Sequence, residues 1–287
     1  MKKVAFIVDS SSGIKEGEYP NVYYMPLIIN KNLDGQITSY KDLIEIDNKE
    51  VCELINKGIN VSTSQPSPGM IAELLDKIAD KYDDIFVLPI HEKLSSAINT
   101  WRMVVEDYKN VHVIPQYSLS RWSRIQLEEL IELSKKKDLT EEIVKNYIES
   151  EKKKWLGFLI VPNVDQLVKG GRVSNFKGMF AKVLNLKLII TYDHNGLVFL
   201  DKASKYENCV KILTKTFNER INLDKSKIKN AVLMKVNYHN NKYDIEPLID
   251  LLKKEYKLND KTPRDVLPSV ITVHTGIDYA AIIVRVE

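Results

Sequence analysis

The first half of the chain alternates short apolar runs with amphipathic helical patterns, and this alternation restricts the fold more than any other feature. The apolar runs lie at residues 4–8, 22–29, 60–62, 85–90 and 111–114. Helical spacing of apolar residues occurs at 47–57, 68–81, 95–108, 122–134 and 140–154. Continuous apolar runs are typical of strands covered on both faces, and intervening helices allow parallel pairing. We therefore predict an N-terminal α/β/α domain with a mostly parallel sheet, in which Pro26 marks an edge or a bulge.

The second half carries a different pattern, with a hairpin signal at Asn195-Gly196 between two apolar runs. Strands are predicted at residues 156–161, 187–192, 197–202, 230–238, 269–274 and 279–286, and helices at 164–168, 176–184, 205–220 and 245–256. Hairpins and helices of this kind indicate a C-terminal α+β domain with a mixed, largely antiparallel sheet. The charged stretch ESEKKK suggests a boundary that divides the chain into domains 1–153 and 154–287.

Composition excludes several classes of function. The net charge is only +3 over 287 residues, which gives no electrostatic case for binding nucleic acid or an anionic membrane surface. No apolar stretch approaches the length that spans a bilayer, and neither phosphate-binding glycine motif, G-x-G-x-x-G or G-x-x-x-x-G-K-[ST], is present. The two cysteines, Cys52 and Cys209, lie far apart and lack metal-ligand spacing. We expect a soluble cytoplasmic protein with reduced thiols, no metal and no stable membrane insertion.

Short hydroxyl side chains follow several of the predicted strands. Asp9-Ser10 follows the first run, Thr63-Ser64 the third, and Ser95-Ser96 the fourth. Ligands of open parallel sheets bind beyond the carboxyl ends of the strands, so these loops are candidates for one site. Taken singly, each cluster is explained by helix capping or turn formation. Together they indicate a polar edge that donates neutral hydrogen bonds to a weakly charged group such as a carboxylate.

Five motifs carry a resemblance to a known family. The stretches DSSSGI, STSQPSPGM, KLSS, VDQLVKGGRVS and VHTG occur in the order and spacing of the DegV family. The chain thus resembles a DegV-family fatty-acid-binding protein over essentially its full length, and the pairing of TSQPSP with LVKGGRVS is the most specific part of the match. The resemblance implies a protein that uses no cofactor and catalyses no reaction itself. It would hold one long-chain fatty acid between its two domains. A separate ATP-dependent fatty acid kinase of the bacterial fatty acid kinase system would then make the acyl phosphate.

The resemblance also implies roles for individual residues. The carboxylate would bind at Thr63 and Ser95, with Ser64, Ser96 and His274 nearby, and the head-group or partner contacts would be Arg172, Asp9 and Ser10. Candidate tail-lining residues are Phe158, Ile160, Met179, Phe180, Leu184 and Leu188. Without the resemblance, the Gly170-Gly171 pair is explained as a turn, Arg172 as a surface charge and His274 as a structural histidine on a strand.

Three departures from the family pattern leave the function open. Ser96-Ala97 stands where a glycine usually follows the serine, the bulky pair Arg121-Trp122 follows the fifth run, and no Gly-Pro-Gly follows His274. These changes allow an altered lipid, a different carboxylate ligand or a member that has lost binding. Two other functions remain alternatives: a ligand-free regulatory or scaffold protein, and a serine hydrolase that uses Ser95, His274 and Asp9, although the nucleophile elbow G-x-S-x-G is absent.

Overall fold

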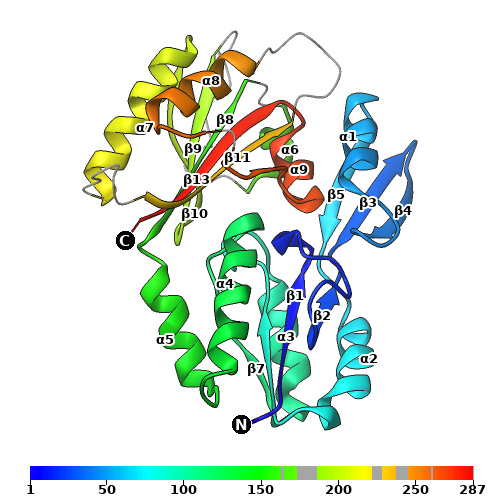
Figure 1. Ribbon diagram of the computed structural model, residues 1–287. Helices are drawn as coiled ribbons and strands as arrows, with labels where there is room; N and C mark the ends of the chain where they lie inside the picture. Colours follow the sequence, from blue (N-terminus) through cyan, green and yellow to red (C-terminus); the bar gives the residue numbers. More distant parts are fainter. Residues whose placement is uncertain (163–164, 173–185, 222–227, 237–244, 260, 287) are drawn as a thin grey trace. The chain divides into compact units, whose positions relative to one another are not determined.

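The computed structural model describes residues 1–162, 165–172, 186–221, 228–236, 245–259 and 261–286 (Figure 1). Its contacts divide the chain into two compact units. The first unit comprises Met1–Val51, Ile59–Ser150 and Pro268–Val270, and the second comprises Cys52–Gly58, Glu151–Leu267 and Ile271–Glu287. Each unit is therefore built from separated stretches of sequence. The predicted boundary after residue 153 assumes two continuous domains, and it stays a prediction.

A parallel sheet forms the centre of the first unit. It consists of β1 (Val4–Asp9), β2 (Val22–Met25), β6 (Asp84–Leu88) and β7 (Val111–Val113), in the order β2-β1-β6-β7 with every pair parallel. The helices around this sheet are α2 (Pro68–Ile78), α3 (Ala97–Val104), α4 (Ser120–Ser134) and α5 (Glu141–Glu151), with short 3₁₀ turns η1 (Ser10–Ser12), η2 (Ala79–Lys81) and η3 (Val105–Asp107).

Alternation along β1 explains the three layers of this unit. Ala5 and Ile7 pack in one apolar cluster with α2 and α3, while Phe6 and Val8 pack in another with α4 and α5. Helices therefore cover both faces of the parallel sheet (Figure 1). The predicted α/β/α architecture with a mostly parallel sheet is confirmed.

A second, antiparallel sheet of the first unit departs from the prediction. It contains β3 (Ile28–Leu33), β4 (Gln36–Lys41) and β5 (Asn60–Ser64) in the order β4-β3-β5. The single run predicted at 22–29 is split at Pro26, which lacks the N–H that a continuous strand needs. The run at 60–62 forms a strand, but it joins this sheet and not the parallel one. The hairpin turn at Asp34-Gly35, with φ of 52° and 88°, was not recognised from the sequence.

The second unit contains one mixed sheet. Its strands are β8 (Trp155–Val161), β9 (Lys187–Asp193), β10 (Gly196–Ala203), β11 (Ile228–Val236), β12 (Arg264–Asp265) and β13 (Tyr279–Val286), in the order β10-β9-β8-β13-β11-β12. All pairs are antiparallel except β11 with β12. The helices α7 (Tyr206–Ile221) and α8 (Glu246–Glu255) lie on one face of this sheet (Figure 1) and share an apolar core with it. The predicted α+β class with a largely antiparallel sheet is confirmed.

Three short helices complete the description: α1 (Asn48–Asn56), α6 (Asp165–Gly170) and α9 (Ser269–Thr275). The helix α9 corrects our prediction of a strand at 269–274. Its β-branched residues favour a strand, but Val270, Ile271 and Val273 are almost fully buried, so packing overrides the local preference. The helix predicted at 176–184 lies outside the described residues.

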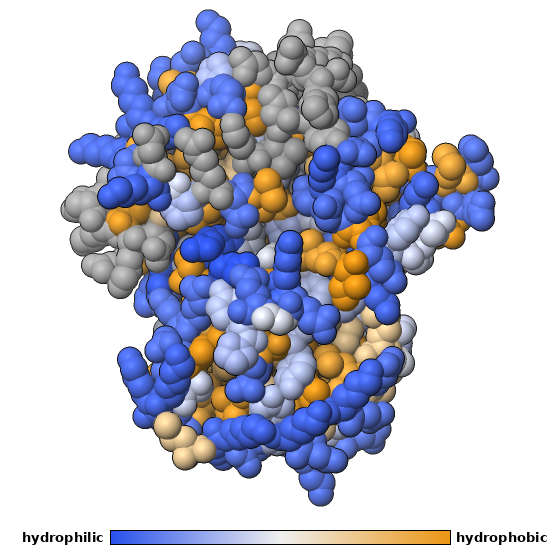
Figure 2. Space-filling model, turned by 45° about the vertical axis from the view of Figure 1, so that its right-hand side comes forward, coloured by the Kyte–Doolittle hydropathy of each residue, from blue (hydrophilic) through white to orange (hydrophobic). Residues whose placement is uncertain are grey.

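The surface in view mixes apolar and hydrophilic residues (Figure 2). The large apolar side chains that are exposed among the described residues are Met1, Leu33, Ile37, Ile44, Met103 and Val266. None of the helices that the structure describes has both the length and the apolar character needed to cross a membrane.

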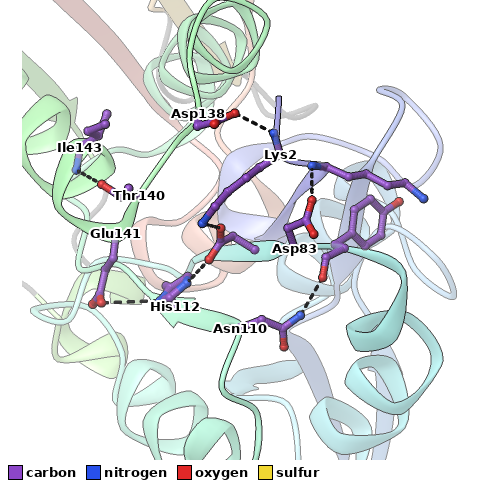
Figure 3. A network of polar contacts seen from close by, with 11 residues as sticks. Lys2, Asp83, Asn110, His112, Asp138, Thr140, Glu141 and Ile143 are labelled. Carbon is purple, nitrogen blue, oxygen red and sulfur yellow. Dashed lines mark hydrogen bonds and ion pairs between the residues drawn. The ribbon is translucent and has the colours of Figure 1, made fainter.

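A charged network closes the amino-terminal edge of the parallel sheet (Figure 3). Lys2 Nζ lies 2.6 Å from one oxygen of Asp84, and His112 Nε2 lies 2.7 Å from the other. The second ring nitrogen of His112 lies 3.5 Å from Glu141. Burial acts to raise the pKa of Asp84, but the contacts with Lys2 and His112 outweigh it and lower the pKa. These charges are paired with one another, so this edge stabilises the fold and offers no candidate site.

Candidate functional site

The strand order β2-β1-β6-β7 places a topological switch point between β1 and β6. Asp9, the last residue of β1, connects the loops that follow these two strands. Asp9 Oδ1 accepts hydrogen bonds from the backbone N–H of Ser11 at 2.9 Å and from its hydroxyl at 2.5 Å. Asp9 Oδ2 accepts one from the N–H of Ile90, just after β6, at 2.5 Å. Burial raises the pKa of Asp9 to about 6, although these hydrogen bonds oppose the shift. Asp9 therefore fixes the geometry of this edge from inside.

Ser10 is also buried and engaged within the protein. Its hydroxyl oxygen accepts a hydrogen bond from the N–H of Leu27 at 3.1 Å. The hydroxyls of Ser10 and Ser269 face the carboxylate of Asp42, which is fully buried, although neither forms a hydrogen bond of full geometry with it. Burial raises the pKa of Asp42 to about 6. Sequence reasoning missed this second buried carboxylate, because nothing in the local pattern distinguishes Asp42 from a surface residue.

The polar side chains of the loop after β7 are also hydrogen-bonded within the protein. Gln116 donates from Nε2 to the carbonyl of Pro89 at 2.7 Å, and its Oε1 accepts from both the N–H and the hydroxyl of Ser118. Ser118 Oγ in turn accepts a hydrogen bond from Ser123 at 3.0 Å. Polar side chains do gather at the carboxyl edge, as expected, but many of them hold the loops together and are not free to bind a ligand.

Gln65 links the two loops that carry the predicted carboxylate ligands. Its Oε1 accepts a hydrogen bond from the Ser96 hydroxyl at 3.0 Å, and its Nε2 donates to the Thr100 hydroxyl at 2.6 Å. Ser96 precedes α3 and Thr100 lies within it, whereas Gln65 directly follows β5. One amide therefore fixes the position of the Thr63 segment relative to the start of α3. Gln65 stands within the TSQPSP motif, and that was the signal from which its role could have been found.

Ser95 is the predicted ligand whose hydroxyl remains able to donate. Its side chain is half-buried, and its Oγ accepts a hydrogen bond from the N–H of Ala97 at 3.2 Å. Within the part of the chain that the structure describes, no acceptor is recorded for its own proton. A hydroxyl in this position, at the N-terminus of α3, suits an anionic oxygen because the helix dipole and the O–H favour the same charge.

Thr63 and Ser64 do not point to the same place. Successive side chains of a strand lie on opposite faces, and both residues belong to β5. Thr63 pairs with Ile29 and is half-buried, whereas Ser64 is exposed and accepts a hydrogen bond from Asn30 at 2.7 Å. Only one of the two can face a common carboxylate, and the link through Gln65 together with its partial burial favours Thr63. Ser96 is exposed and engaged with Gln65.

In the second unit, Arg172 and His274 converge on one backbone group, although about a hundred residues separate them. Arg172 Nη1 donates to the carbonyl of Gly170 at 2.7 Å, and His274 also contacts the Gly170 backbone. Burial, followed by the positive charge of Arg172, lowers the pKa of His274 to about 4, so the imidazole is neutral near pH 7. The two residues implied by the family motifs are therefore brought together, with Arg172 exposed and His274 partly buried on α9.

The glycine pair of the same motif is required for two different reasons. A Cβ on Gly170 would lie 2.8 Å from His274 Nδ1, so the absence of a side chain permits the close approach of His274. Gly171 has a φ of +62° with open space around it, which is the left-handed conformation that ends helix α6. The motif is thus more than a turn, since Gly170 is set by its contact with His274.

The predicted tail-lining residues divide into three groups. Phe158 and Ile160 lie in the core that the sheet shares with α7 and α8, where their side chains pack against these helices. Leu188 is fully buried and pairs with Val161, which places it on the opposite face of the sheet from Phe158 and Ile160. Met179, Phe180 and Leu184 lie outside the described residues.

The departures from the family pattern are visible in the first unit. Ala97 is fully buried at the start of α3, and Trp122 is buried on α4. Arg121 Nε is buried and has no hydrogen-bond partner among the residues described. Ser96, which stands at the usual glycine position, is exposed, whereas Trp122 adds a large buried ring and Arg121 adds a cation at the start of α4.

Comparisons with known proteins agree with the motifs. Residues 3–287 match the family described as "Uncharacterised protein, DegV family". A DegV domain-containing protein of Mycoplasmopsis pulmonis is 32% identical over 292 residues, which cover 99% of this chain and 96% of that protein. The fatty acid binding DegV family protein SAG1342 of Streptococcus agalactiae has a TM-score of 0.80 at 21% identity, with all of both chains covered.

A further solved structure concerns fatty acid binding of a DegV family protein from Thermus thermophilus. It has a TM-score of 0.78 at 21% identity, and the match covers 99% of this chain and 100% of that one. At this level of identity, the likeness to both solved structures establishes a shared fold. Among the described residues, no group of three or more His, Cys, Asp or Glu side chains lies close enough to hold a metal ion.

Proposed function

The chain belongs to the DegV family, and from that premise we propose that it is a fatty-acid-binding protein in which Thr63 and Ser95 hold the carboxylate. Full-length likeness to the streptococcal and Thermus proteins, whose descriptions state fatty acid binding, supports the class of ligand. The residue assignment rests on the geometry of the first unit and on the family motifs.

The observation that carries the proposal is the hydroxyl of Ser95, which accepts one internal hydrogen bond and retains its proton for an external acceptor. Gln65 ties its loop to the Thr63 segment, so the two candidate hydroxyls are held without a ligand. Burial of about fourteen methylenes at ~0.8 kcal/mol each is favourable by about 11 kcal/mol before ordering costs. Hydrogen bonds to a carboxylate add about 1.5–3 kcal/mol each against its desolvation. The tail thus supplies affinity and the hydroxyls supply orientation, with Leu188 as the described candidate for a tail contact.

The second part of the proposal concerns catalysis. The protein presents the bound acid to a separate ATP-dependent kinase in the cytoplasm and performs no bond chemistry itself. Arg172 is exposed and oriented by the Gly170 carbonyl, which suits a contact with the partner or with the reacting head group. Cys52 and Cys209 are buried and belong to no disulfide, which fits a reducing compartment. The hydrolase alternative loses support, because Asp9 already binds Ser11 and Ile90 through both of its carboxylate oxygens.

The test combines identification of the ligand with three variants. Native mass spectrometry of the purified protein, followed by extraction, should detect a bound fatty acid. In oleate titrations, Ser95→Ala should weaken binding about tenfold, and Thr63→Val, which keeps the shape and removes the hydroxyl, should act similarly. Ser64→Ala is the matched control, because its side chain lies on the other face of β5, and it should leave the affinity within about twofold.

Two outcomes count against the assignment. Retention of wild-type affinity by the double variant Thr63→Val and Ser95→Ala would place the carboxylate elsewhere. A purified protein without fatty acid that also fails to bind oleate would favour the ligand-free scaffold. With the partner kinase, Arg172→Ala should bind oleate normally and lower the rate of acyl-phosphate formation.

A further inference from the structure

A cavity lies within the second unit, lined by none of the residues assigned to the fatty acid. Its volume is about 400 Å³. Lys152 and Lys153, from the segment between α5 and β8, line it together with Arg220 near the end of α7, and the ring of Trp155 contributes an aromatic wall. The turn between β9 and β10 supplies the remaining side, through Asp193 and its neighbours. Three separate stretches of the chain therefore converge on one concave surface.

The charges around this cavity are unbalanced toward the positive. Two lysines and one arginine line it together with a single carboxylate, Asp193, so its lining side chains carry more positive than negative charge. Asp193 is bonded already: Oδ1 accepts from the N–H of Asn195 at 2.7 Å, and Oδ2 accepts from Arg220 Nη1 at 2.8 Å. Its negative charge is buried and serves to fix the guanidinium and the turn.

The donors of Arg220 and Lys153 are arranged to meet an external anion. The recorded bond of Arg220 uses Nη1 alone, so its other N–H groups have no partner among the residues described. Lys153 is exposed, and no ion pair is recorded for it among the described residues. A guanidinium held by a carboxylate on one side presents a rigid fork on the other, and that fork matches the oxygens of a phosphate. Preorganisation by Asp193 lowers the entropy lost on binding.

We propose that this cavity binds a phosphate group, with Arg220 and Lys153 as the main contacts. A phosphate monoanion or dianion matches the positive lining, and a volume of about 400 Å³ lies in the range of small-molecule sites but is too small for an extended peptide. The phosphate can belong to a soluble molecule or to the headgroup of an anionic lipid. The proposal is independent of the fatty acid site, because it uses no residue assigned there.

The experiment uses the full-length protein in phosphate-free buffer at constant ionic strength. One arm titrates inorganic phosphate by calorimetry, and the other measures cosedimentation with vesicles of phosphatidylglycerol, with phosphatidylcholine vesicles as the neutral reference. Lys153→Glu should weaken binding of the active probe at least tenfold. Lys205→Glu is the matched control, since it makes the same charge change at an exposed lysine of the same unit outside the cavity, and it should change binding less than twofold. Arg220→Lys keeps the charge and removes the fork, so it should produce an intermediate loss.

Each outcome decides the proposal. Binding of either probe that Lys153→Glu lowers selectively supports the site, and the probe that binds identifies the source of the phosphate. Absence of binding to both probes, or an equal loss in Lys153→Glu and Lys205→Glu, overturns it. Oleate affinity measured on the same preparations should be unchanged in every variant, which separates this result from the fatty acid assignment.

Discussion

The carboxyl edge of the first unit and the Gly170 cluster of the second unit are both polar, but they are stabilised in different ways. At the edge, side chains cross-link separate segments: Asp9 accepts from the backbone N–H of Ile90, in the loop after β6, and Gln65 connects β5 to α3. In the cluster, Arg172 and His274 meet at one backbone carbonyl, and their approach depends on the missing side chain of Gly170.

The buried titratable groups of the two regions respond oppositely to pH. In the first unit, burial raises the pKa values of Asp9 and Asp42, so their charged forms are disfavoured in the folded state. In the second, burial and Arg172 lower the pKa of His274, which again disfavours the charged form. Acid therefore favours the folded first unit through its carboxyls and disfavours the folded second unit through its imidazole.

The largest expected effect is that of Gly170→Ala. The new Cβ would lie within 3.0 Å of His274 atoms, and two of the three close contacts are at or next to the backbone, so neither residue can move away easily. We expect a loss of about 3 kcal/mol in the free energy of unfolding, measured by urea denaturation. Gly171→Ala is the control: its left-handed φ gives a loss of about 1 kcal/mol, because its surroundings are open. Equal losses in the two variants would show that the contact with His274 is unimportant.

The next effect is that of Asp42→Asn on the pH dependence of stability. The pKa of Asp42 is about 6 in the folded protein and about 3.8 when unfolded, so the unfolded state releases its proton first as the pH rises. The contribution of this group is full below pH 4 and is lost as the pH rises through 6. The stability of the wild type relative to Asp42→Asn should fall by on the order of 2 kcal/mol between pH 4 and pH 7. Parallel pH profiles from denaturant titrations would contradict this.

A smaller effect is expected for Arg172→Gln, which should raise the pKa of His274. Burial remains the larger cause, so the pKa should stay below the ordinary value of 6.5. His274 contributes stability that is full above pH 6.5 and is lost as the pH falls toward 4. In the variant the onset of the loss stays near pH 6.5, which the unfolded state sets, but the loss is smaller and ends at a higher pH. Imidazole shifts followed by NMR measure the change, with Lys169→Gln, a nearby exposed cation on α6, as the control. If the pKa of His274 is the same in the two variants, the charge of Arg172 does not lower it.

The smallest effect, which depends on the proposed function, concerns Gln65. Gln65→Ala removes both hydrogen bonds between the β5 loop and α3 and should weaken oleate binding severalfold, or about 0.5–1 kcal/mol, by loosening Thr63 relative to Ser95. Asn30→Ala breaks a similar side-chain bond on the opposite face of β5, to Ser64, and should leave the affinity unchanged. An affinity that is insensitive to Gln65→Ala would mean that the loops are positioned by their backbones alone.

Much of the fold was predictable because its elements have strong periods. Continuous apolar runs such as 4–8 and 85–90 indicated buried strands, and the Asn195-Gly196 turn indicated a hairpin. The failures occurred where local preference and packing disagree. The segment 269–274 is rich in β-branched residues and forms α9, and the run at 60–62 has strand character that does not reveal which sheet it joins.

For the candidate site, the residue types that gather beyond the strands, and the motifs that accompany them, could be read from the sequence alone. The individual roles of these residues depend on the fold. It placed Thr63 and Ser64 on opposite faces of β5, engaged Asp9 and Ser10 inside the unit, left the Ser95 proton available, and brought His274 to Gly170. The physical reason is that a side chain's type is local, whereas the partners that satisfy or bury it come from distant segments.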